Sequence, residues 1–433
     1  MLHANIRRVR LGARFHKSAR RPAMALLLAA LAFVAYTSNG HIQGAGDTVA
    51  ASLVATTLLT DFSFRLDRFA ELWTAGGDRC PDVCNELAYF LTRTPRGVVS
   101  LYPVATGILA APFMAPAISV SATPEAQAEA AHRQEKYAAA IITAVSIVAF
   151  AALCWQLGFS DWLTAGLTLF YALGSQAFNT SSQLLWQHGP GTLFILLAFL
   201  CFSRLQAHVT RAAAVSFALA WAVAVAIRPM NAVAVGPLVA LAIYRFPRVD
   251  TYAVLPAILL GLPIVAYNLY FFGTIGGGYG TQVFSLGAGV PGLLLSPGRG
   301  LFLYFPIAVV ALVLSVRRRL WLSDDIARAA LMAVASAILF YGSYDQWHGG
   351  WSVGPRYLTE VEPLLLILLG LVWPARARGL GVACFGILLP YCIFIQAVGA
   401  YSTASLRWND DRKPDGLGAL WDFRDNPISH AFR

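Results

Sequence analysis

The stretch Pro22-Ala-Met-Ala-Leu-Leu-Leu-Ala-Ala-Leu-Ala-Phe-Val-Ala-Tyr-Thr-Ser38 decides the fold class. It is almost wholly apolar, and a helix of this length crosses most of the hydrocarbon core of a bilayer. Residues 1–21 carry basic side chains and no acid, which predicts a cytoplasmic tail because basic residues stay on the cytoplasmic side of membrane helices. No small-residue cleavage site leads into a soluble domain, so we interpret the stretch as a retained helix and not as a signal peptide.

Similar apolar segments recur to the far end of the chain. Of its 433 residues, 58% are hydrophobic and 12% are charged, about half the charged share of an ordinary soluble protein. The sequence therefore predicts an all-α polytopic transmembrane helical bundle with about 11–13 membrane segments. After the first, they lie at about 98–117, 137–157, 162–178, 190–203, 212–227, 230–244, 251–272, 300–316, 327–344, 358–373 and 379–400.

These segments divide the chain into three parts. After the tail comes a transmembrane domain over residues 22–400, whose first loop, 39–97, is exported to the periplasm if the host is a bacterium. The tail over 401–433 is also predicted on the exported side, as a polar surface flap. Aromatic and charged residues alternate over 61–73, which is typical of a helix lying in the membrane interface.

The net charge of +10 does not indicate nucleic-acid binding here, because the basic residues lie between apolar segments. In that position they set the orientation of the membrane helices and contact anionic lipid headgroups. Four linkers carry the clearest basic charge and are predicted to be cytoplasmic: 204–211, 245–248, 317–319 and 376–378. The basic linkers place the start of the segment near 190 on the exported side. Counting membrane crossings from the N-terminus places the same point in the cytoplasm. One element between 48 and 178 must therefore be half-spanning, or a hairpin.

Two further features lie between these segments. Cys80 and Cys84 share the exported first loop, where an oxidising compartment favours a disulfide. A zinc site is disfavoured because no second ligand pair lies nearby. The polar stretch 125–136 resembles a helical extension into solvent.

Polar residues on the predicted exported side form the candidate site, since such groups are costly at a membrane boundary. Arginines there can hold a phosphate through bidentate hydrogen bonds, tryptophans can face a sugar ring or prenyl chain, and a carboxylate can act as general base. The candidates for catalysis are Asp47 and His188. The candidates for substrate binding are Tyr102, Trp186, Arg228, Asn231, Tyr279, Arg299, Trp347, His348, Trp351, Arg356 and Tyr357.

Each candidate also has a structural interpretation. Asp47 could cap the helix starting at Thr48, and His188 before Gly-Pro could be an interfacial loop residue. The arginines could anchor helix ends at the headgroups, and the tryptophans could form an aromatic belt. The glycine-rich stretch 273–280 is not a phosphate loop, because it lacks the spacing and the lysine.

Taken in order, the motifs resemble bacterial integral-membrane glycosyltransferases of the GT-C class. The similarity is greatest to a branch related to protein O-mannosyltransferases and the lipid A aminoarabinose transferase, and it covers roughly residues 22–400. The motifs are Asp47 after the first helix, Tyr102-Pro, Trp186-Gln-His-Gly-Pro, Arg228-Pro-Met-Asn, Ser296-Pro-Gly-Arg-Gly and Trp347-His-Gly-Gly-Trp-Ser-Val-Gly-Pro-Arg-Tyr.

The resemblance implies an inner-membrane enzyme that takes a sugar from a polyprenyl-phosphate carrier. It would transfer the sugar on the periplasmic side to a glycan, lipid or protein, usually with inversion. Asp47 matches the first-loop acid that acts as base or positions the acceptor. Many members have an acidic pair there, whereas Thr48 follows Asp47 in this chain, so we predict no obligatory metal and no other cofactor.

Two alternatives remain open from the sequence. A lipid-linked glycan polymerase or ligase that uses diphosphate donors would also need arginines on the exported side. A sugar or lipid transporter (flippase) shares the hydrophobic layout, but transporters typically show inverted repeats and charged or broken helices at mid-membrane. No repeat is found here, and the polar residues gather at one face, which favours the enzyme.

Overall fold

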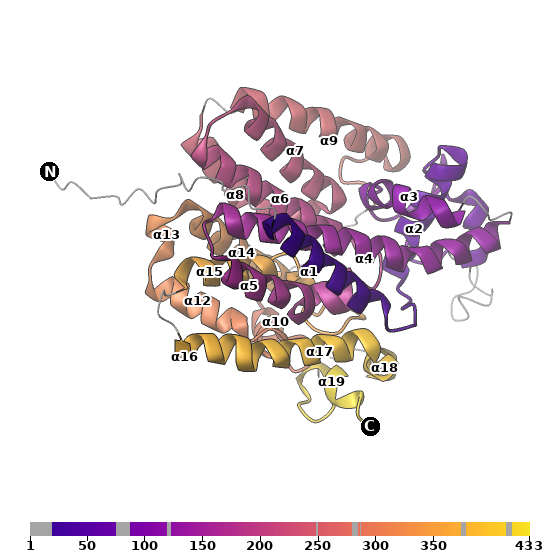
Figure 1. The fold of residues 1–433 in the computed structure, drawn as a ribbon. Helices are drawn as coiled ribbons and strands as arrows, with labels where there is room; N and C mark the ends of the chain where they lie inside the picture. The colour runs from indigo at the N-terminus through magenta and orange to yellow at the C-terminus, as the bar shows by residue number, and fades with distance from the viewer. Residues whose placement is uncertain are drawn as a thin grey trace.

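The structure, a computed structural model, describes residues 20–74, 87–118, 123–247, 250–278, 285, 287–373, 378–412 and 418–433. It is a bundle of helices, as predicted, with one small hairpin of strands (Figure 1). Within these ranges, six helices are long and apolar enough to cross a membrane. They are α1 (Arg20–Thr37), α4 (Pro124–Gln156), α6 (His188–Ala207), α9 (Asp250–Phe272, from Leu255), α14 (Asp325–Ser343) and the π-helix η6 continuing into α17 (Val382–Tyr401).

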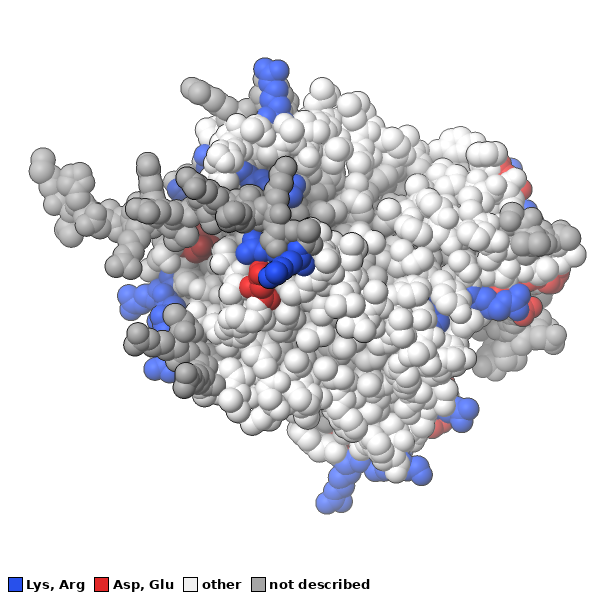
Figure 2. All heavy atoms as spheres, in the orientation of Figure 1, with Lys and Arg blue, Asp and Glu red and all other residues white. Residues whose placement is uncertain are grey.

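Shorter apolar helices complete the bundle. Several break at a proline or at an irregular turn, as at η4 (Pro229–Asn231) between α7 and α8. They are α5 (Asp161–Gly174), the π-helix η3 (Ala177–Ser181), α7 (Arg211–Ile227), α8 (Ala232–Arg245), α10 (Val290–Leu295), α11 (Leu301–Tyr304), α12 (Ile307–Arg317), α13 (Leu320–Ser323), α15 (Glu362–Val372) and α16 (Arg378–Gly381). Figure 2 shows charged side chains mainly toward the two ends of the bundle, with a broad uncharged surface between them.

The basic linkers meet at one end of the bundle. Asp325 accepts hydrogen bonds from Arg245 at 2.9 Å and Arg328 at 2.6 Å, and it lies 3.5 Å from the Gln206 amide. These contacts bring together the linkers after α6, after α8 and before α14. Figure 1 places α16, which begins in the fourth basic linker, toward the same end as α13. The prediction that these linkers share one side is therefore consistent with the structure.

The segment predicted to cross at 98–117 does not form one spanning helix. Strands β1 (Leu91–Thr94) and β2 (Gly97–Ser100) pair antiparallel, and α3 (Ala105–Ile118) follows. At 1.5 Å per residue α3 is about 21 Å long, short of the roughly 30 Å hydrocarbon core. It packs against α2 (Gly46–Asp61) through Gly107, where a Cβ would lie only 2.7 Å from Val54. A hairpin of α2 and α3 is one of the two kinds of irregular element that the segment count allows.

The first loop folds around its own apolar cluster. The predicted interfacial helix over 61–73 is instead two short 3-10 turns, η1 (Asp67–Phe69) and η2 (Glu71–Trp73). Phe69 is fully buried, and it packs with Leu53 of α2 and Phe90 before β1. Burying these rings against α2 is favourable by about 1.5–3 kcal/mol per side chain. The loop therefore holds the start of α2 in a fixed place.

Helix α4 also corrects the prediction for 125–136. The stretch is helical, but Glu135 and Lys136 are buried and not solvated. The Lys136 ammonium donates to the Asn39 side chain and to the His41 carbonyl oxygen. Because Asn39 and His41 belong to the segment between α1 and α2, α4 fixes the chain just before Asp47.

The C-terminal residues are not a free flap. Helix α18 (Thr403–Arg412) packs near α17, and a short 3-10 turn, η7 (Ala419–Trp421), leads to α19 (Pro427–His430). Trp408 is fully buried, and the Asn409 side chain accepts a hydrogen bond from Arg299. The tail thus packs on the loop between α10 and α11, and the Trp351 indole, which donates to Asp410 at 3.0 Å, joins it to the loop between α14 and α15.

Candidate active site

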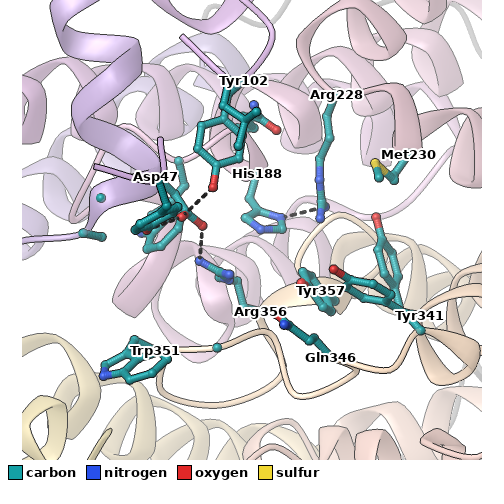
Figure 3. A pocket seen from close by; sticks show the side chains of 18 of the residues that line it. Asp47, Tyr102, His188, Arg228, Met230, Tyr341, Gln346, Trp351, Arg356 and Tyr357 are labelled. Atoms are coloured by element: carbon teal, nitrogen blue, oxygen red, sulfur yellow. Dashed lines mark hydrogen bonds and ion pairs between the residues drawn. The ribbon is translucent and has the colours of Figure 1, made fainter. Parts of the chain in front are cut away.

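A cavity of about 630 Å³ is lined by residues at the start of α6 and the end of α14, the ends of these helices opposite the basic linkers. Figure 3 shows this cavity from close by. Its wall combines four distant parts of the chain: the start of α2, the residues around 89–102, the start of α6 with the end of α7, and the loop after α14. Eight of the predicted site residues line it: Asp47, Tyr102, Trp186, His188, Arg228, Trp351, Arg356 and Tyr357. The structure thus brings together residues up to 310 positions apart in sequence.

Asp47 has three hydrogen-bond partners at the cavity wall. Its Oδ1 accepts from the Tyr89 hydroxyl at 2.7 Å and the Tyr102 hydroxyl at 2.8 Å, and its Oδ2 accepts from Arg356 Nη1 at 3.2 Å. Burial raises the pKa of Asp47, but the charge of Arg356 and the tyrosine hydrogen bonds outweigh burial, so the pKa lies below its usual value. Asp47 is therefore an ionised carboxylate at neutral pH.

The helix-cap interpretation of Asp47 does not hold. Ala45 is the N-cap of α2, and no side chain caps that end. Asp47 lies in the first turn, where the helix dipole favours an acid, but its side chain points into the cavity toward Arg356 (Figure 3). Its contacts are therefore those of a site residue.

Arg356 connects Asp47 to an aromatic wall. Its guanidinium lies over the Trp186 ring, with the central carbon 4.2 Å from the ring centroid, a cation–π arrangement. Its Nε is buried and has no hydrogen-bond partner in the described part of the chain. Arg356 is thus a cation at the cavity wall. Its ionic partner among the described residues, Asp47, also lines the cavity.

A second cluster of ionisable residues, formed by His188, Arg228 and Glu360, lies next to the Asp47–Arg356 pair. His188 Nδ1 is 2.9 Å from Glu360 Oε1, and Arg228 Nη1 is 3.0 Å from the same oxygen. Arg228 also lies over the rings of Tyr341 and Tyr357, at 5.2 and 5.4 Å. The Glu360 side chain is 4% exposed, so water does not replace these two contacts. Both carboxylates of the site are therefore paired with cations.

Four predicted site residues do not line the cavity. Arg299 is fully buried and donates to the carbonyl oxygens of His348, Gly298 and Gly350 and to the Asn409 side chain. It fixes the loop that carries Arg356 and is not placed to hold a ligand. The others are Trp347, buried against glycines of α10, His348, whose Nδ1 accepts from the Gly350 amide, and Asn231, which donates to the Ala224 carbonyl oxygen.

Three further predicted residues, Tyr279, Cys80 and Cys84, lie outside the described residues. The predicted disulfide therefore stays a prediction. Across the described ranges, no three His, Cys, Asp or Glu side chains gather as a metal site would require. The prediction that catalysis needs no metal stays a prediction too.

Sequence reasoning missed two important residues. Tyr89 lies in a polar loop with no distinguishing pattern around it. Glu360 had a signal, because it and Glu362 are acids at the start of an apolar segment, four and six residues after Arg356. Ionisable residues in such a position are functional candidates by default.

A second hollow continues from the cavity. This apolar groove, of about 450 Å³, lies between α7 and α9 and shares Leu101, Tyr102, Met230 and Gly278 with the cavity. Its other walls are mostly apolar side chains from the two helices, such as Trp221 and Ile264. The charged cavity thus adjoins a surface suited to a hydrocarbon chain.

The fold and site define a polytopic all-α membrane protein with a folded first loop beside a charged cavity. Two solved structures share this fold, both of ArnT from Cupriavidus metallidurans. The apo state aligns with a TM-score of 0.52 and 14% identity, over 89% of this chain and 76% of that chain. The structure bound to undecaprenyl phosphate aligns with a TM-score of 0.52 and 12% identity, over 95% and 74%.

The resemblance predicted from the motifs is therefore confirmed at the level of the fold. No family model matches the sequence. No curated protein matches it either.

Proposed function

We propose that this protein is a membrane glycosyltransferase that moves a sugar from a polyprenyl-phosphate carrier to a hydroxyl of a glycan, lipid or protein. The observation that carries the proposal is the convergence of Asp47 with Arg228 and Arg356 on one cavity. The shared fold with a protein solved with undecaprenyl phosphate supports the same conclusion. The basic end of the bundle then faces the cytoplasm, and the cavity opens to the periplasm of a bacterial inner membrane, with the N-terminus cytoplasmic.

The proposed reaction is a single displacement with inversion. The Asp47 carboxylate accepts the proton of the acceptor hydroxyl while the acceptor oxygen attacks C1 of the donor sugar. The bond between C1 and the phosphate oxygen breaks, and the oxygen leaves with the electron pair. Arg228 and Arg356 stabilise the negative charge that develops on the departing phosphate.

The two hollows match the two halves of such a donor. The charged cavity takes the sugar phosphate, and the groove between α7 and α9 takes the first isoprene units of the carrier. Tyr102 and Met230 lie where the two hollows meet. A carrier can therefore enter sideways from the bilayer without removing its chain from an apolar environment.

The test is sugar transfer by purified protein from a panel of labelled polyprenyl-monophosphate and polyprenyl-diphosphate sugars. We expect consumption of a monophosphate donor, and a fall on the order of 10²–10⁴-fold in Asp47→Asn, the loss that follows removal of a general base. The matched control is Asp61→Asn, because Asp61 ends the same helix and pairs with Arg68 at the surface. Full transfer by Asp47→Asn, or consumption of diphosphate donors only, contradicts the proposal.

A further inference from the structure

His188 has a defined orientation at the cavity wall, and the proposed reaction gives it no role. Its Nδ1 faces Glu360 Oε1 at 2.9 Å, and Arg228 Nη1 lies 3.2 Å from the same ring nitrogen. Arg228 can only donate hydrogen bonds, whereas Nδ1 of a neutral imidazole either donates or accepts. The two neighbours therefore favour opposite tautomers, and the stronger acceptor decides which one forms.

The carboxylate is the stronger partner. Glu360 Oε1 lies within 3.0 Å of both Nδ1 and Arg228 Nη1, so both N–H groups can donate to it at once. Glu360 is 3% exposed, and its other oxygen, Oε2, has no hydrogen-bond partner within the described residues. A buried carboxylate with so few donors retains the two that it has. His188 accordingly carries its proton on Nδ1.

The other ring nitrogen remains for the cavity. His188 is part of the cavity wall, and its polar side-chain contacts within the described chain are all at Nδ1. The charged groups that face the ring are Glu360 before α15, Arg228 at the end of α7 and Arg356 in η5 (Arg356–Leu358). With Asp47 included, the two carboxylates and two guanidiniums cancel, so a donor phosphate adds one uncompensated negative charge.

We propose that Glu360 is a positioning residue that fixes His188 with Nε2 toward the cavity, where Nε2 carries a proton to the phosphate of the leaving carrier. This inference rests on the proposed function. When the donor binds, Nε2 takes a proton from solvent and donates a hydrogen bond to a phosphate oxygen. As the bond from C1 to the phosphate oxygen breaks, the phosphate receives that proton, and His188 returns to neutral. The acceptor proton stays on Asp47 and then passes to solvent.

The tautomer of His188 tests the positioning without any turnover. The purified protein, labelled with ¹⁵N-histidine, contains eight histidines, and His188→Gln assigns the resonance of His188. We expect the Nδ1–H form in the unsubstituted protein. In Glu360→Gln the carboxylate is gone and Arg228 becomes the stronger donor to Nδ1, so the resonance should change to the Nε2–H form.

Glu362→Gln is the matched control. Glu362 lies two residues on, is equally buried, and accepts from the Gln176 amide at 2.7 Å instead of contacting His188. This variant should keep the Nδ1–H form and the thermal stability of the unsubstituted protein. An Nε2–H form in the unsubstituted protein, or no change in Glu360→Gln, overturns the inference.

Kinetics supply the second readout. Glu360→Gln should lower kcat on the order of 10²–10⁴-fold, the contribution of a positioned general acid, because the histidine is no longer held in the required tautomer, with little change in donor KM. His188→Gln should cost about as much, and the double variant no more than either alone. Additive losses overturn the inference. If the unsubstituted protein transfers no sugar while the tautomer results hold, the proposed function fails and the positioning by Glu360 stands.

Discussion

Removing the charge of Asp47 should tighten binding of the phosphate carrier although it should slow transfer. Arg356 is paired with Asp47 at 3.2 Å, and the Arg356 side chain is 8% exposed. A phosphate must therefore compete with a carboxylate for this guanidinium. In Asp47→Asn the two tyrosines keep an acceptor at position 47, but Arg356 loses its anionic partner.

The size of the effect follows from the geometry. Two unit charges at this distance attract by about 5 kcal/mol at an effective dielectric of 20, and most of that is offset by desolvation and by the water that the cavity admits. A net value of about 1–2 kcal/mol for a partly exposed pair is consistent with measured ion pairs. With 1.4 kcal/mol per factor of ten, binding should tighten by roughly 5- to 30-fold.

The assay is equilibrium binding of undecaprenyl phosphate to purified protein at two salt concentrations. Asp47→Asn should show the gain, and more strongly at low salt, because screening weakens charge interactions. Asp61→Asn should bind like the unsubstituted protein. Unchanged or weaker binding by Asp47→Asn would refute the idea that one guanidinium serves both the carboxylate and the phosphate.

Four further outcomes are expected. Arg356→Ala should lose undecaprenyl phosphate binding by at least tenfold, measured in the same assay, because one of two cavity cations is gone. Arg299→Met should lower the thermal midpoint, with a loss of about 3 kcal/mol, because it leaves buried carbonyl oxygens without a donor; an unchanged midpoint would contradict its structural role. Trp351→Ala, at a side chain 47% exposed whose indole donates to Asp410 at 3.0 Å, should raise the acceptor KM and leave the thermal midpoint within 1 °C or so. Because the pKa of Asp47 is lowered, Asp47 stays an ionised base above that pKa and loses this role only as pH falls through it, so a fall in transfer between pH 7 and 5 would contradict the role.

Four of the candidate residues that line the cavity were marked in the sequence by their position at a membrane boundary. Asp47, His188, Arg228 and Arg356 each interrupt or border an apolar run, and all four line the cavity. Arg299 meets the same criterion, but it is buried and its guanidinium donates hydrogen bonds to backbone carbonyl oxygens. A basic residue next to glycines has the same local pattern whether it binds a ligand or a loop, so only the packing distinguishes the two.

The tryptophans show the same limit. Trp186, Trp347 and Trp351 were equivalent as candidate platforms for a sugar ring or prenyl chain. In the structure Arg356 covers a face of Trp186, and Trp347 is buried against Gly292, where a Cβ would lie 2.2 Å from its ring. Trp351 alone among the three combines a place on the cavity wall with large exposure.

The sequence by itself determined the fold class, because apolar runs of this length can satisfy their backbone only as helices in lipid. It also determined that the basic linkers share a side, since their charge sets orientation. Only the tertiary structure decided that 98–117 belongs to a hairpin, that Glu360 reaches His188, and that Arg299 supports a loop. Those outcomes depend on contacts between residues far apart in the chain, and local patterns carry no information about which distant groups will meet.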